Sequence, residues 1–124
     1  FIMNGVTEDE MIRPAVEGTK ALLEGCKDYG VKKCIITSSM ISVQSADNIK
    51  DHYEEKDFAP EDGPIHSPYA KSKIKAELTA WDFHKNLPEA SPLEIVTIHP
   101  GFIFGKNLFF DSNSFQKNRN NSFF

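Results

Sequence analysis

Apolar residues recur at helical spacing along the first quarter of the chain, which predicts an amphipathic helix over residues 8–29. Thr7 can cap this helix, acidic residues fill its first turn, and Gly30 follows its end. The stripe expected to face the core consists of Ile12, Val16, Leu22, Leu23 and Cys26. Pro14 leaves a second start open, near Arg13, because proline is best tolerated in a first helical turn.

The same order of elements is repeated further along. Residues 31–37 form a predicted strand whose second half is continuously apolar, which is typical of a strand buried on both faces. A second helix is predicted over 68–86, with Ser67 as its cap and a proline at its first position. Its inward stripe is expected to be Ala70, Ile74, Leu78 and Trp81. A second buried strand follows over 93–98.

Helix, strand, helix and strand in this order indicate an α/β fold with a parallel sheet. Two strands are too few for a stable domain, and a sheet of this kind needs helices on both of its faces. We therefore expect residues 1–105 to be the middle part of a doubly wound parallel sheet, truncated at both ends. Residues 106–124 are rich in Phe and Asn and show no period, so this tail is expected to be poorly ordered.

Composition narrows the class of protein. A net charge of −4 argues against a general nucleic-acid binder, and no apolar run is long enough to span a membrane. Neither a signal peptide nor metal-ligand spacing among the four histidines is visible. Cys26 and Cys34 are best explained as small apolar residues. We expect a cytoplasmic protein without a metal site and without membrane or nucleic-acid partners.

The candidate chemistry lies at the predicted strand ends. Thr37-Ser38-Ser39 closes the first strand, and Tyr69 and Lys73 share one face of the second helix. Open α/β sheets bind ligands at the carboxyl ends of their strands. A phenol is a poor base at neutral pH, but a nearby ammonium favours its charged form and so equips it for proton exchange. A tyrosine of this kind can exchange a proton with the oxygen of a hydroxyl or carbonyl whose carbon gains or loses hydride. A nicotinamide cofactor is the natural source of that hydride.

Four segments carry a family resemblance: residues 13–19, 35–39, 67–73 and 99–105. Through them the chain resembles the extended short-chain dehydrogenase/reductase superfamily, also called the NAD-dependent epimerase/dehydratase family. Within it, the chain is most similar to the dihydroflavonol-reductase-like and cinnamoyl-CoA-reductase-like branch. The resemblance implies a Rossmann-type sheet.

The resemblance also assigns roles to residues. It implies that Ser39 is the catalytic serine, with Ser38 as the rival, and that Tyr69 is the general acid/base. Lys73 would favour the phenolate and hold the nicotinamide ribose. The residues expected against the nicotinamide are Pro100, Gly101 and Ile103. An asparagine that many extended members carry is replaced here by Ala15.

The implied activity is the interconversion of a secondary alcohol and a carbonyl on a small molecule, with NADP or NAD as the cofactor. The family's glycine-rich turn, which binds the pyrophosphate, does not occur in these 124 residues. We therefore expect a fragment that is inactive alone and prone to self-association through an exposed sheet edge. Two alternatives stay open: a sugar epimerase or dehydratase, and a truncated non-catalytic paralogue or interaction module.

Overall fold

The fold is taken from a computed structural model that describes residues 7–44, 49–61 and 67–104. Helix α1 (Glu8–Asp28) is followed by strand β1 (Lys33–Thr37) and a single 3-10 turn, η1 (Met40–Ser42). Helix α2 (Pro68–Lys85) and strand β2 (Glu94–Ile98) complete the order. Each predicted element is present, with bounds that differ by at most two residues. The tail at 106–124 lies outside the described residues.

The start of α1 is fixed by a capping box. The Thr7 backbone N–H donates to Glu10 Oε2 at 2.8 Å, and the Glu10 N–H donates back to Thr7 Oγ1 at 3.3 Å. Because this reciprocal pair closes the first turn, the helix begins at Glu8 and Pro14 lies inside it. The alternative start near Arg13 is therefore wrong. Gly30 follows the helix with a φ of 69°, a conformation that favours glycine.

The N-terminal end of α2 is set in the expected way. Ser67 is its N-cap, and the serine side chain accepts a hydrogen bond from the Ala70 N–H at 3.2 Å. Pro68 occupies the first helical position, where its missing N–H costs nothing. The first turn of α2 carries Tyr69, so this cap determines where the candidate acid/base lies.

The two strands pair in parallel, as the sequence predicts, with Lys33 opposite Glu94 and Thr37 opposite Ile98. A parallel pair needs a long crossover, which α2 supplies. The strand ladder also continues past the end of β1, since the Ser38 N–H donates to the Ile98 carbonyl at 2.9 Å. The segments that follow the two strands are thereby held side by side.

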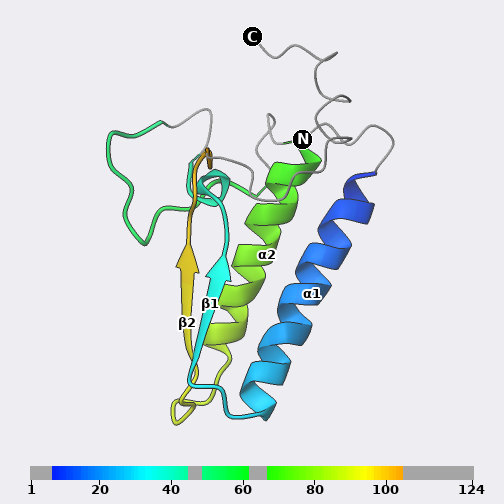
Figure 1. The fold of residues 1–124 in the computed structure, drawn as a ribbon, viewed down its shortest axis with the longest axis vertical. Helices are drawn as coiled ribbons and strands as arrows, with labels where there is room; N and C mark the ends of the chain where they lie inside the picture. The colour runs from blue at the N-terminus through cyan, green and yellow to red at the C-terminus, as the bar shows by residue number, and fades with distance from the viewer. Residues whose placement is uncertain (1–6, 45–48, 62–66, 105–124) are drawn as a thin grey trace.

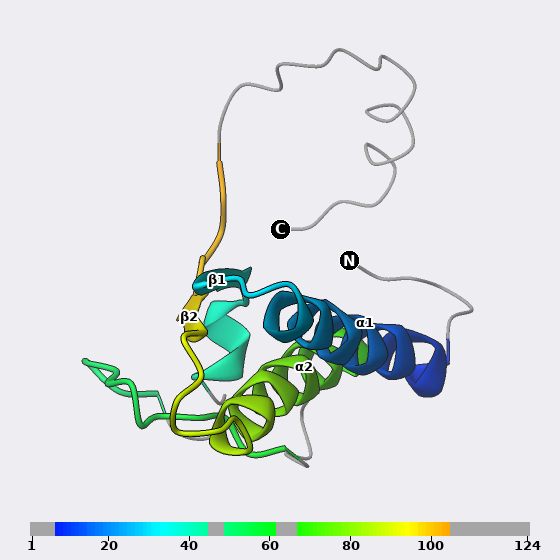
Figure 2. The same cartoon turned by 90° about the horizontal axis from the view of Figure 1, so that it is seen from below.

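Both helices lie on one face of the strand pair, as Figures 1 and 2 show. The buried cluster lies between that face and the helices and comprises Leu23, Cys34, Ala80, Leu93 and Ile95. Leu22, expected in the core, is instead 58% exposed. Neither described helix is long and apolar enough to cross a membrane.

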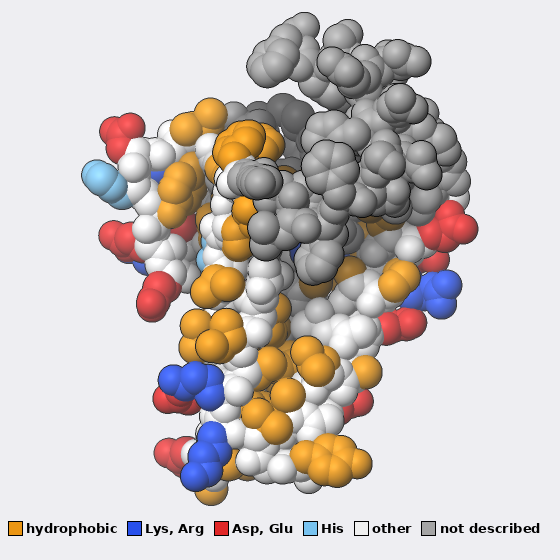
Figure 3. Space-filling model, viewed as in Figure 1, with side chains coloured by type: hydrophobic (Ala, Val, Ile, Leu, Met, Phe, Trp, Pro, Cys, Tyr) orange, Lys and Arg blue, Asp and Glu red, His pale blue; other side chains and the backbone are white. Residues whose placement is uncertain are grey.

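The opposite face of the strands carries exposed apolar side chains, visible in Figure 3. They belong to Ile35, Val96 and Ile98, and exposed and less exposed positions alternate along both strands. The prediction of strands buried on both faces is thus wrong for the residues described, because α1 and α2 pack side by side on the same face.

Candidate active site at the strand carboxyl ends

The N-terminal end of α2 lies at the same end of the molecule as the carboxyl ends of β1 and β2 (Figure 1). The 3-10 turn η1, which follows β1, packs against α2. The candidate residues after β1, after β2 and in the first turns of α2 therefore share one region. This is the edge at which parallel α/β sheets bind ligands.

Tyr69 and Lys73 are neighbours on α2. The Lys73 Nζ lies 5.9 Å from the centroid of the Tyr69 ring, which is within cation–π distance. Both side chains are half-buried. The spacing of four residues thus produces the proximity that the sequence predicts.

Lys73 also lines a small cavity with the end of β1. The cavity has a volume of about 190 Å³, and Thr37, Ser38 and Glu77 contribute to its wall. Ala15 lines it from α1. Lys73 therefore shares this partly open cavity with Thr37 and Ser38, whereas Ser39 is not among its lining residues.

The two candidate serines have different environments. Both serines are buried, at 7% and 9% exposure, but the Ser38 Oγ donates to the Glu77 carboxylate and lies 3.0 Å from Ser42 Oγ. Ser39 begins η1, and its Oγ accepts a hydrogen bond from the Ile41 N–H at 3.4 Å. Among the described residues, no hydrogen bond uses the Ser39 hydroxyl as a donor.

The segment after β2 approaches η1 closely at Gly101. The Met40 N–H donates to the Pro100 carbonyl at 3.1 Å, and a Cβ added at Gly101 would lie 3.2 Å from Met40 Sδ. Pro100 and Gly101 are therefore beside the turn that Ser39 begins. Ile103 is 86% exposed in the extended segment beyond them.

Glu77, the buried carboxylate of this region, was not predicted from the sequence. Glu77 is 2% exposed and accepts hydrogen bonds from Ser38, from His99 Nε2 at 2.8 and 2.9 Å, and from Trp81 Nε1 at 3.3 Å. Burial alone raises the pKa of the Glu77 carboxyl, but hydrogen bonds from Ser38, His99 and Trp81 outweigh it and lower the pKa. The signal was the spacing, since Glu77 continues the four-residue series from Tyr69 and Lys73.

Metal-ligating side chains and the Cys34 thiol also bear on the chemistry open to the described residues. No group of three or more His, Cys, Asp or Glu side chains in the described segments is placed to hold a metal ion. Burial raises the pKa of the Cys34 thiol, which favours an inert, packed side chain.

The family model described as the 3-beta hydroxysteroid dehydrogenase/isomerase family matches residues 2–123. The chain belongs to this family. A putative uncharacterized oxidoreductase of Saccharomyces cerevisiae is 36% identical over 116 residues, covering 85% of this chain and 33% of the relative. Anthocyanidin reductase of Arabidopsis thaliana is 34% identical, covering 84% of this chain and 32% of the relative. The resemblance to reductases of this superfamily is thereby confirmed.

Solved structures give the same result for the fold. Gre2 of Candida albicans in complex with NADPH matches with a TM-score of 0.71 at 33% identity, over 87% of this chain and 35% of that one. Yeast methylglyoxal/isovaleraldehyde reductase Gre2, also complexed with NADPH, matches with a TM-score of 0.72 at 26% identity, over 88% of this chain and 35% of that one. The predicted Rossmann-type α/β class is confirmed. The chain spans about a third of the length of these relatives.

Proposed function

We propose that this chain is the catalytic segment of an NADPH- or NADH-dependent oxidoreductase that reduces a carbonyl on a small molecule. The observation that carries the proposal is the Tyr69–Lys73 pair on the first turns of α2, at the strand ends where α/β sheets bind ligands. The family membership and the NADPH complexes of the structural relatives support it.

Each residue has a defined part in this reaction. Tyr69 donates a proton to the carbonyl oxygen, while the Lys73 ammonium, 5.9 Å from the ring, stabilises the phenolate left behind. Ser39 donates a hydrogen bond to the same oxygen. A bound reduced nicotinamide would supply the hydride that the carbonyl carbon accepts.

The cofactor is proposed to lie along the end of the sheet. Lys73 would hold the nicotinamide ribose, and Pro100, Gly101 and Ile103 would lie against the nicotinamide. The close approach at Gly101 fits this placement, since a side chain there would press on Met40. Because the chain spans about a third of its relatives, we propose that these 124 residues alone do not turn over a substrate.

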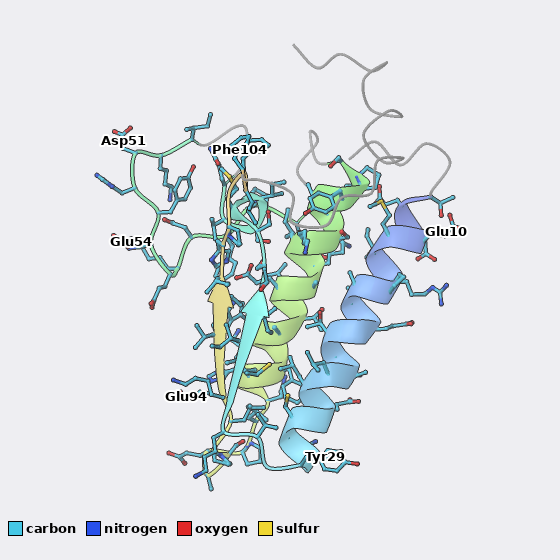
Figure 4. All side chains as sticks on the ribbon, viewed as in Figure 1. Glu10, Tyr29, Asp51, Glu54, Glu94 and Phe104 are labelled. Atoms are coloured by element: carbon cyan, nitrogen blue, oxygen red, sulfur yellow. The ribbon has the colours of Figure 1, made fainter. Side chains whose placement is uncertain are left out.

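The test transfers the segment into an assayable enzyme. Residues 7–104 replace the matched third of yeast Gre2, and the reduction of methylglyoxal by NADPH is followed in the chimera. Tyr69→Phe should lower kcat about 100-fold or more, the usual scale for loss of a general acid. Tyr29→Phe is the matched control, because Tyr29 is 90% exposed at the far end of α1 (Figure 4). Equal activity of the two variants would refute the assignment of Tyr69.

A further inference from the structure

The carboxylate of Glu77 joins three elements of the fold. It accepts hydrogen bonds from Ser38 after β1, from His99 after β2, and from Trp81 one turn further along α2. Its side chain is nine-tenths or more buried, at 2% exposure. A buried carboxylate is expensive unless its lone pairs are satisfied, and these donors satisfy them.

This bonding engages the Ser38 hydroxyl within the fold. The Ser38 hydroxyl donates a hydrogen bond to Glu77, and its Oγ lies 3.0 Å from Ser42 Oγ, so this hydroxyl is already hydrogen-bonded within the fold. The Ser39 hydroxyl differs, because its Oγ accepts a hydrogen bond from the Ile41 N–H but donates none to any described residue. Of the two hydroxyls, the one at Ser39 is available to a carbonyl oxygen.

The same carboxylate links the segments that follow the two strands. His99 directly precedes Pro100, whose carbonyl accepts from the Met40 N–H. Ser38 directly precedes Ser39, the cap of the turn that contains Met40. Glu77 therefore holds both neighbours of the proposed serine and nicotinamide positions, yet it is one turn along α2 from Lys73.

We propose that Glu77 is a positioning residue that occupies the Ser38 hydroxyl and anchors His99, so that Ser39 is the serine that faces the substrate. The proposal rests on the proposed function. It assigns Glu77 no contact with substrate or cofactor, and it decides between Ser38 and Ser39 by what each hydroxyl already binds.

The first test uses the 124-residue chain. Trp81 is its single tryptophan, so the indole N–H gives one unambiguous NMR signal beside Glu77. Glu77→Gln and Ser38→Ala should each shift this signal, since both alter the same hydrogen-bonded group. Glu94→Gln, which removes an exposed carboxylate at the opposite end of β2 (Figure 4), should leave it in place. An indole signal that Glu77→Gln does not move would overturn the proposal.

The second test is kinetic and uses the yeast Gre2 chimera. Ser39→Ala should lower kcat about 100-fold, and Ser38→Ala and Glu77→Gln about 10-fold each, with the KM for NADPH changed less than about 2-fold. The Ser38→Ala/Glu77→Gln double variant should be no slower than Glu77→Gln alone, because Glu77→Gln already alters the hydrogen bond that Ser38→Ala removes. A merely structural role would instead lower stability and leave kcat of the folded fraction unchanged.

The outcomes separate this proposal from the function on which it rests. Loss of activity in Ser38→Ala with retention in Ser39→Ala would overturn the assignment of the serines while Tyr69 remains the acid. Wild-type kcat in Glu77→Gln would overturn the positioning role. Full activity in Tyr69→Phe would instead refute the proposed function, whatever the NMR signal of Trp81 shows.

Discussion

Two adjacent leucines of α1 offer a direct measurement of how much the core contributes to stability. Leu23 is completely buried in the cluster beneath the sheet, whereas Leu22 is 58% exposed. Replacing each by alanine removes the same atoms from the same helix. Any difference between the two variants therefore reports packing rather than helix propensity.

The expected loss at Leu23 follows from its burial. Transferring a leucine side chain out of water contributes about 1.5–3 kcal/mol, and the cavity left behind brings typical Leu→Ala losses to about 2–5 kcal/mol. Its neighbours Ala80 and Cys34 are small and held by a helix and a strand, so they cannot fill the space. Leu23→Ala should thus lose at least about 2 kcal/mol, and Leu22→Ala less than about 1 kcal/mol.

Urea unfolding followed by circular dichroism measures both losses. In a domain of this size, about 2 kcal/mol corresponds to a fall in Tm of about 10 °C, which a thermal scan checks independently. Similar losses for Leu22→Ala and Leu23→Ala would show that α1 does not pack through the face described here.

Three further predictions concern the site. Gly101→Ala should cost less than about 1 kcal/mol in thermal denaturation, and Met40→Ala in the same chain should remove that loss, because the added methyl meets the Met40 sulfur; a loss that persists in the double variant would contradict the contact. The folded-state pKa of Glu77 lies below its ordinary value of 4.5, so its contribution to stability is present above that value and is lost as the pH falls through the folded pKa. The urea midpoints of wild type and Glu77→Gln should therefore converge in acid. Midpoints that stay equally far apart at every pH would show that the Glu77 carboxylate does not cause the pH dependence. Calorimetric titration of the 124-residue chain with NADPH should show no micromolar binding, and a micromolar Kd would refute the proposal that the chain needs further segments.

The element bounds could be predicted because their signals are local. Thr7 with Glu10 and Ser67 with Pro68 each mark the start of a helix within one turn of sequence, and these caps are found in the structure. The parallel pairing could also be predicted, because helix and strand alternate. None of these inferences needs knowledge of what packs on what.

The face that each residue presents was harder to predict. Leu22 belongs to an apolar stripe, yet α2 covers only part of it, so burial depends on a partner that periodicity does not specify. Glu77 was missed for the same reason: a charged residue on a helix is ordinarily solvated, and its burial depends on donors from Ser38 and His99 in other elements. The resemblance favours Ser39 over its rival Ser38, but the hydrogen bond that distinguishes the two hydroxyls joins Ser38 to Glu77 on another element and could not be predicted from the sequence.

The parallel pairing of β1 and β2 also bears on how the chain folds. Lys33 and Glu94 are partners about 60 positions apart, and closing such a separation costs entropy before any contact repays it. Contacts within α1 and α2 are local and can form early, whereas Ser38 meets Glu77 only when the end of β1 packs on α2, and His99 meets it only when the end of β2 does. The candidate site is therefore completed only by long-range packing, and a chain in which the two helices alone have formed would still lack it.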